Sequence, residues 1–167
     1  MEKSVIFYGS NGGTTEAIAN QIAGKIGNGI EVINVANAAA VDVEKYTNII
    51  LGTSTWGIGD LQDDWENFLP NLAKVDLSGK IIALFGLGDA CSYGDSFVDA
   101  IGTIYEEIKD KGCTLVGQVE TNGYSFDDSK AVYDGKFVGL PLDEENESDQ
   151  TESRIDNWLE QIIPLFK

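Results

Sequence analysis

Hydrophobic residues along the chain fall into short apolar runs that alternate with longer stretches of helical spacing. Three of the short runs are almost continuously apolar, which is typical of parallel strands that are covered on both faces. We therefore expect five strands, at Val5–Tyr8, Ile30–Val35, Ile49–Leu51, Ile81–Phe85 and Leu115–Val119.

The stretches between these runs carry apolar residues every three or four positions, the spacing of an amphipathic helix that packs one face on a core. The last helix is predicted to start at Asp149, where Glu152 three residues later completes a capping-box pattern. Alternating strands and helices predict an α/β fold: a doubly wound, five-stranded parallel sheet with helices on both faces. The four stripes are Ala17, Ile18, Ile22 and Ile26; Leu61, Trp65, Phe68, Leu69 and Leu72; Phe97, Ile101, Ile104, Tyr105 and Ile108; and Ile155, Trp158, Leu159, Ile162 and Ile163.

One stretch, residues 120–142, interrupts this alternation. It carries the turn signals Asn122–Gly123, Asp127–Asp128 and Asp134–Gly135 between short aromatic or apolar runs. We interpret it as an insertion of roughly twenty residues with β character, which splits the fifth strand. No other break in composition divides the chain, so residues 1–167 are predicted to form a single domain.

The 167-residue chain has a formal charge of −17, from 28 acidic and 11 basic residues, and contains no histidine. Such an acidic surface repels nucleic acid and anionic membranes, and it favours encounter with basic faces of other proteins. Cys91 and Cys113 match no metal or redox spacing, as expected of packed thiols in a reducing compartment. Because Met1 is followed by no signal-peptide pattern and no apolar run reaches membrane-spanning length, we expect a cytoplasmic protein.

The segment Ser10–Thr15, between the first predicted strand and the first helix, consists of small and hydroxyl-bearing residues plus one asparagine. Backbone N–H groups and hydroxyls in such a turn can bind a phosphate at the helix N-terminus. The turn contains no Lys or Arg, whereas a triphosphate-binding loop requires a lysine. It therefore predicts a site for one terminal phosphate, although a plain strand-to-helix turn would have the same composition.

Two further loops follow the third and fourth predicted strands, and each carries one aromatic residue, Trp56 or Tyr93, among turn-forming residues. Because the carboxyl ends of parallel strands meet at one edge of the sheet, we expect the three loops to lie together. The indole of Trp56 can cover the face of an aromatic ligand there, or it can fold back on the domain. A phosphate turn beside two loop aromatics predicts a ligand with a flat ring and a phosphate tail, and flavin mononucleotide (FMN) fits this best.

The same segments resemble the flavodoxins, and specifically the long-chain type, over nearly the whole chain. The resemblance implies a sheet with strand order 2-1-3-4-5 and non-covalently bound FMN at the point where that order reverses. It also implies a low-potential one-electron carrier rather than an enzyme, with no catalytic residue and no metal. The segments that carry the resemblance are Ile6–Ser10 with the turn after it, Thr55–Trp65, Gly86–Tyr93, Ser129–Val132 with Asp134–Leu140, and Leu142–Asn146.

By this resemblance, the turn after the first strand holds the FMN phosphate, and the two loop aromatics sandwich the isoalloxazine ring. Gly12 departs from the family pattern, because a hydroxyl residue is usual there; one hydrogen bond to the phosphate, worth about 1.5–3 kcal/mol, is therefore missing. The implied FMN contacts are Ser10, Asn11, Gly12, Gly13, Thr14, Thr15, Ser54, Thr55, Trp56, Gly57, Ile58, Gly59, Leu87, Gly88, Asp89 and Tyr93.

The resemblance further implies that the peptide between Gly57 and Ile58 flips, so that its carbonyl accepts a hydrogen bond from the protonated N5 of the flavin and stabilises a neutral blue semiquinone. Glycine permits the positive φ that such a flip requires. The protein would then cycle mainly between semiquinone and hydroquinone. Negative charge around the ring should make the second reduction step unfavourable and its potential strongly negative. The acids expected there are Asp60, Asp63, Asp64, Asp89 and Asp95.

For the family, the expected partners are redox enzymes such as a flavodoxin/ferredoxin-NADP reductase or a 2-oxoacid oxidoreductase, contacted by a monomer. An alternative is a flavodoxin-like, FMN-dependent NAD(P)H:quinone reductase, which needs room for nicotinamide beside the flavin. A phosphoacceptor receiver domain shares this topology but needs an acidic pair after the first strand, where the chain has Gly9–Asn11.

Overall fold

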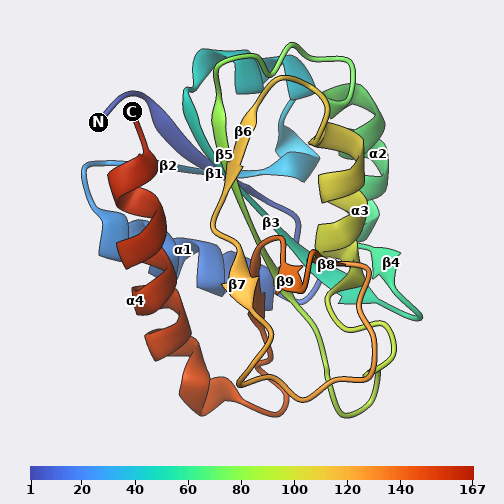
Figure 1. The fold of residues 1–167 in the computed structure, drawn as a ribbon. Coiled ribbons are helices and arrows are strands. Elements are labelled where there is room, and N and C mark those ends of the chain that lie inside the picture. The colour runs from blue at the N-terminus through green and yellow to red at the C-terminus, as the bar shows by residue number, and fades with distance from the viewer.

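A parallel β-sheet runs through the middle of the molecule, with helices packed on both of its faces (Figure 1). The structure, a computed structural model, describes residues 1–167. The strands stand in the order β2-β1-β3-β5, and both β6 and β10 pair with β5 at the far edge. These strands are β1 (Ser4–Tyr8), β2 (Glu31–Asn34), β3 (Asn48–Trp56), β5 (Ile81–Leu87), β6 (Thr114–Val116) and β10 (Leu140–Leu142).

The last position in the sheet is shared by two short strands, as the sequence predicts for a split fifth strand. β6 pairs with the first half of β5, from Ile81 to Ala83, and β10 pairs with the second half, from Phe85 to Leu87. The intervening chain forms a separate antiparallel sheet of β7 (Val119–Glu120), β9 (Lys136–Phe137) and β8 (Val132–Tyr133). The strand order 2-1-3-4-5 and the β character of the insertion are therefore confirmed.

Four α-helices cover the sheet: α1 and α4 lie on one face, α2 and α3 on the other (Figure 1). Each buries most of the apolar stripe that the sequence shows, but Ala17 of the first stripe is exposed. The outermost members of the other three stripes, Leu61, Phe97 and Ile163, lie outside the helices. The helices are α1 (Thr14–Ile26), α2 (Asp63–Leu72), α3 (Asp99–Ile108) and α4 (Thr151–Ile162).

The predicted start of the last helix is wrong. Residues Ser148–Gln150 form a 3-10 turn, and α4 begins only at Thr151, without any side-chain cap. Glu152 therefore stands in the first turn of the helix and completes no capping box with Asp149. The carboxylate of Glu152 instead lies 3.5 Å from the ammonium of Lys25 on α1.

β3 extends well past the predicted Ile49–Leu51 and reaches Trp56. Pairing with β5 continues as far as Ser54, and the chain then turns back into the short antiparallel strand β4 (Asp60–Leu61). The turn between β3 and β4 contains Gly57 and Gly59, which have φ values of 52° and 85°. Glycine adopts these left-handed conformations without the clash of a Cβ atom, so the loop projects beyond the sheet as a narrow hairpin.

The crossover from β2 to β3 contains two 3-10 helices, Val35–Asn37 and Ala40–Lys45, where the sequence predicts no helix. They pack beside α2.

Two fully buried tryptophans anchor the core, one on each face of the sheet. Trp65 donates its indole N–H to the Gly52 carbonyl at 2.8 Å, and Trp158 donates to the Gly117 carbonyl at 3.0 Å. No helix of the structure is both long enough and apolar enough to cross a membrane.

Candidate functional site

Three loops and one further segment meet around a cavity of about 250 Å³ at the carboxyl ends of β1, β3 and β5. Thirteen of the sixteen site residues that the sequence predicts line this cavity. Gly13, Ile58 and Gly59 lie on the same loops but not on its wall. The lining residues are Ser10, Asn11, Gly12, Thr14, Thr15, Ser54, Thr55, Trp56, Gly57, Leu87, Gly88, Asp89, Tyr93, Ser96, Glu144 and Glu145.

The first loop forms an open helix N-terminus. α1 begins at Thr14. The residue before it, Gly13, is the N-cap and has φ 89°, and no side chain accepts a hydrogen bond from the helix N-terminus as a cap. Ser10 shapes the turn, because its hydroxyl accepts a hydrogen bond from the Gly13 N–H at 3.0 Å. The first N–H groups of a helix have no acceptor within the helix, so they face the cavity region with a partial positive charge. This arrangement suits an anionic group such as a phosphate.

The two predicted aromatics lie on two different loops of the cavity and are both half exposed, 45% for Trp56 and 48% for Tyr93. Trp56 therefore does not fold back into the core. Its indole N–H donates to the Ser54 hydroxyl at 2.8 Å, which fixes the ring at the end of β3. Tyr93 stands in a turn closed by its own N–H, which donates to the Asp89 carbonyl at 2.9 Å. These rings offer two apolar faces to a flat ligand.

The third loop is held in place by carboxylates that accept hydrogen bonds. Asp89 accepts from the N–H groups of Ser92 and Cys91 and from the Asn146 amide, at 2.9, 3.2 and 2.8 Å. The Ser92 N–H, followed by the Asn146 amide, holds the pKa of Asp89 below its ordinary value. Asp143, which is fully buried, accepts from the Ala90 N–H at 3.0 Å.

Three lining residues were missed by the sequence reasoning. Glu144 and Glu145 reach the cavity because Asp143 and Asn146 on either side of them bind the third loop. The only signal for them was the motif Leu142–Asn146, which the resemblance quotes without assigning it a place. Nothing in the sequence marks Ser96 apart from other serines, because its place depends on the fold of the third loop.

Ser96 tests whether the cavity fits a polar ring with a phosphate tail. Its side chain is 3% exposed, and its hydroxyl has no hydrogen-bond partner within the protein. A buried hydroxyl without a partner costs free energy, so a ligand with a polar edge would satisfy it. With free N–H groups at one end, two aromatic faces and this hydroxyl, the cavity fits such a ligand.

The comparisons with known proteins agree with this geometry. The family model described as Flavodoxin matches residues 6–158. The chain is 45% identical over 168 residues to the flavodoxin of a Nostoc species, and 48% identical over 166 residues to that of Helicobacter pylori; each match covers 99% of both chains. A crystal structure of Fusobacterium nucleatum flavodoxin bound to flavin mononucleotide has 34% identity and a TM-score of 0.95, with full coverage of both chains. The chain belongs to the flavodoxin family.

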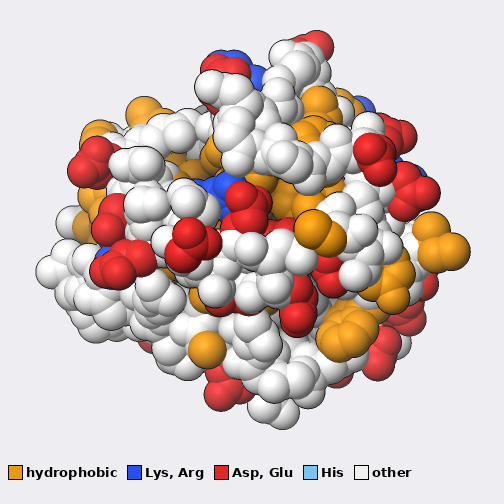
Figure 2. All heavy atoms as spheres, turned by 90° about the horizontal axis from the view of Figure 1, so that it is seen from below, with side chains coloured by type: hydrophobic (Ala, Val, Ile, Leu, Met, Phe, Trp, Pro, Cys, Tyr) orange, Lys and Arg blue, Asp and Glu red, His pale blue; other side chains and the backbone are white.

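Negative charge surrounds the cavity of this flavodoxin. Three carboxylates, those of Asp89, Glu144 and Glu145, line it, and no lysine or arginine does. Of the five acids that the sequence places around the ring, only Asp89 is on the cavity wall. Figure 2 shows the end of the molecule where β3 and β5 finish, with acidic side chains distributed over it and few basic groups.

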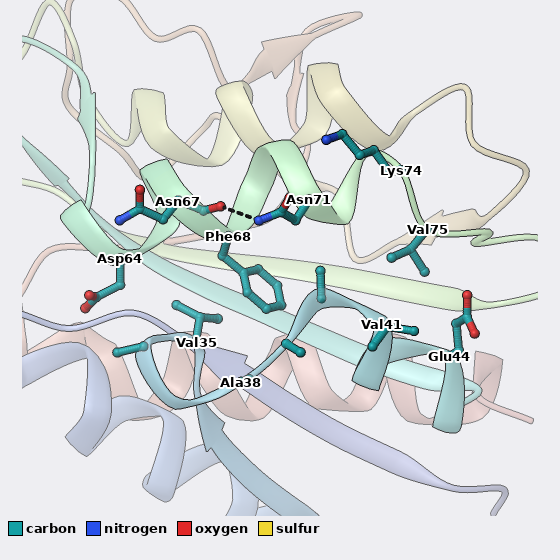
Figure 3. Close-up of a pocket in the computed structure, with 13 residues that line it drawn as sticks. Val35, Ala38, Val41, Glu44, Asp64, Asn67, Phe68, Asn71, Lys74 and Val75 are labelled. Carbon is teal, nitrogen blue, oxygen red and sulfur yellow. Dashed lines mark hydrogen bonds between the residues drawn. The ribbon is translucent and has the colours of Figure 1, made fainter.

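A larger cavity of this flavodoxin, about 570 Å³, lies elsewhere, between the two 3-10 helices and α2 (Figure 3). The ring of Phe68 projects from α2 toward the small apolar side chains of Val35 and Ala38 on the opposite segment, and Asn67 and Asn71 lie on α2 as well (Figure 3). It contains no glycine-rich turn and no exposed aromatic ring. We therefore place the functional site in the smaller cavity, where the strand ends and the three loops converge.

Proposed function

We propose that this flavodoxin is a low-potential electron carrier that binds FMN non-covalently and transfers one electron at a time. The observation that carries the proposal is the single cavity in which an open helix N-terminus, two half-exposed aromatic rings and three carboxylates meet. FMN supplies reversible one-electron reduction, and the chain supplies the binding, the shielding from water and the electric field.

The phosphate of FMN would be held by the turn Ser10–Thr15 at the start of α1. Its donors are backbone N–H groups and hydroxyls, and Gly12 contributes only its backbone. The turn carries no basic side chain, so only uncharged donors and the dipole of α1 face the negative charge of the phosphate. This design binds the tail of the cofactor without adding positive charge near the ring.

The ring would lie between Trp56 and Tyr93, with its polar edge toward the backbone of Thr55–Gly59 and Leu87–Asp89. Ser96 adds a hydroxyl donor that has no other partner. The aromatic faces keep water from the ring, and the carboxylates nearby make added negative charge unfavourable. Both effects lower the reduction potential, which is what a donor of low-potential electrons requires.

The surface charge fits transient docking on redox enzymes. A formal charge of −17 speeds encounter with a basic face and gives an association that weakens as salt rises. The partners we infer are a flavodoxin/ferredoxin-NADP reductase, a 2-oxoacid oxidoreductase or a similar enzyme, met by a monomer in the cytoplasm. An NAD(P)H:quinone reductase activity is not favoured, because no basic residue lines the cavity to bind a dinucleotide.

A visible spectrum recorded during stepwise anaerobic reduction of the purified protein tests the proposal. We expect a yellow protein that is reduced in two separate one-electron steps, without steady-state oxidation of NAD(P)H. A single two-electron step would contradict the one-electron role and favour a reductase. A colourless protein that does not bind added FMN would contradict the assignment of the cavity.

A further inference from the structure

The side chain of Gln62 is completely buried and uses its whole hydrogen-bonding capacity. Its Oε1 accepts from the N–H groups of Asp64 and Trp65, at 3.1 and 3.3 Å, and so caps the start of α2. Its Nε2 donates to Asp64 Oδ2 at 2.8 Å and to Asn11 Oδ1 at 2.6 Å. A primary amide has two donor hydrogens and one acceptor oxygen, and all of them are occupied here.

This capping contact fixes the orientation of a second amide, that of Asn11. Because Oε1 of Gln62 must face two backbone N–H groups, its Nε2 must face Asn11. Asn11 can receive that bond only through Oδ1, so its own Nδ2 points away from Gln62. No protein atom accepts a hydrogen bond from Asn11 Nδ2, and Asn11 is exposed on the cavity wall within the phosphate turn.

The start of α2 also packs directly against the beginning of the phosphate turn. A Cβ atom at Gly9, the residue before the turn, would lie 2.1 Å from Gln62 Oε1 and 2.7 Å from Trp65 Cδ1. Only a glycine leaves room for the capping amide at this position. The bridge from α2 to the turn is therefore built into the packing of both segments.

We propose that Gln62 is a positioning residue for the cofactor phosphate: it orients the Asn11 amide so that Nδ2 donates to a phosphate oxygen. The inference rests on the proposed function, because it assigns the phosphate of FMN to this turn. Asn11 then supplies the side-chain donor that Gly12, which has no hydroxyl, does not. It does so without a positive charge, which keeps the cavity free of basic groups.

The test compares FMN with riboflavin, which has the same ring and no phosphate. Asn11→Ala removes the donor and leaves the cap of α2 intact; Gln62→Met removes the amide that orients the donor. Both variants should bind FMN about ten- to a hundredfold more weakly, the loss of one hydrogen bond to a charged group, and bind riboflavin as the unmodified protein does. Gln62→Glu, which keeps the capping oxygen, replaces Gln62→Met if that variant does not fold.

The double variant Asn11→Ala/Gln62→Met shows whether the two residues act as one unit. If Gln62 acts through Asn11, the double variant binds FMN no more weakly than the single variant that has the lower FMN affinity. Asn71→Ala is the matched control, because it removes an amide of the same helix whose only hydrogen bond is to the Asn67 carbonyl, at 3.2 Å, and which lies outside the smaller cavity. It should change the affinity for neither flavin.

Two results would overturn the role of Gln62. One is an equal loss of affinity for FMN and riboflavin in Gln62→Met, which would indicate general damage to the fold of the site. The other is unchanged FMN affinity in either single variant. Failure of the unmodified protein to bind FMN would instead overturn the proposed function itself, so the two failures are distinguishable.

Discussion

Asn146 donates a side-chain hydrogen bond to Asp89 at 2.8 Å, and this bond ties the loop after β10 to the loop that carries Tyr93. The same amide nitrogen also donates to both oxygens of the fully buried Asp143, at 3.1 and 2.9 Å. The side of the cavity formed by the third loop is thus set by residues more than fifty positions apart in the chain. The bond from Asn146 also helps to lower the pKa of Asp89.

Asn146→Ala should raise the pKa of Asp89 toward its ordinary value, because the Asn146 amide is the second cause that lowers it, after the Ser92 N–H. A lowered carboxylate pKa stabilises the fold above the unfolded-state value, about 4, and that contribution is lost as the pH falls through the folded-state pKa. An NMR pH titration of the Asp89 carboxyl measures the change. Asn157→Ala, at an exposed position of α4, is the control and should leave it unaltered.

Trp56→Ala should weaken binding of FMN and riboflavin alike, by roughly two- to tenfold, because the indole would contact only the ring. Trp56 is 45% exposed, so the free energy of unfolding of the apoprotein should change by no more than about 0.5 kcal/mol. Quenching of flavin fluorescence gives both dissociation constants. A loss confined to FMN would place Trp56 at the phosphate instead of the ring.

Gly57→Val should destabilise the protein by about 1–2 kcal/mol, because Gly57 has φ 52° and a β-branched residue is strained there. A Cβ atom would also lie 2.8 Å from Asp60 Oδ2. The restricted peptide should reduce the fraction of one-electron-reduced flavin at the midpoint of a reductive titration. Gly24→Ala in α1, where a Cβ meets open space, should not change that fraction; an unchanged fraction in Gly57→Val would contradict the peptide flip.

Glu144→Gln and Glu145→Gln should each raise the potential of the second reduction step by about 20–35 mV, for a charge about 10 Å from the ring. Both carboxylates line the cavity, so their field acts on charge added there. The shifts should shrink as ionic strength rises, since solvent-exposed charges are screened. Spectroelectrochemistry at two salt concentrations measures them. Glu160→Gln in α4, outside the cavity, should shift the potential by less than either.

Asp99→Asn should raise the free energy of unfolding at neutral pH. Asp99 is 4% exposed, and burial raises the pKa of its carboxyl although the Lys130 N–H, at 2.7 Å, opposes the shift. The Asp99 carboxyl therefore keeps its proton to a higher pH in the folded state than in the unfolded state. Its contribution to stability consequently falls as the pH rises above about 4. The asparagine keeps the acceptor and removes this dependence. Urea unfolding at several pH values measures this. If the unmodified protein and Asp99→Asn lost stability in parallel as the pH rose, the role of Asp99 would be contradicted.

Most of the architecture follows from local patterns. The apolar runs and helical stripes place the five sheet positions and four helices, because burial on both faces or on one face leaves a periodic trace in the sequence. The sequence predicts the ends of helices and strands less well. α4 starts at Thr151 rather than Asp149, since a preceding 3-10 turn takes up the residues that resemble a cap. β3 is longer than its apolar run because pairing with β5 and β4 extends it through polar residues.

For the candidate site, the sequence by itself determined the three loops and their chemistry: small and hydroxyl-bearing residues at a helix start, and Trp56 and Tyr93 among turn residues. Tertiary structure alone decided what joins them. Ser96 is buried without a hydrogen-bond partner. Glu144 and Glu145 line the cavity because Asn146 binds the third loop. Gln62 bonds to Asn11, which lies fifty-one positions away in the chain. A local pattern records only neighbours within a turn or a strand, whereas these contacts form when distant segments pack together.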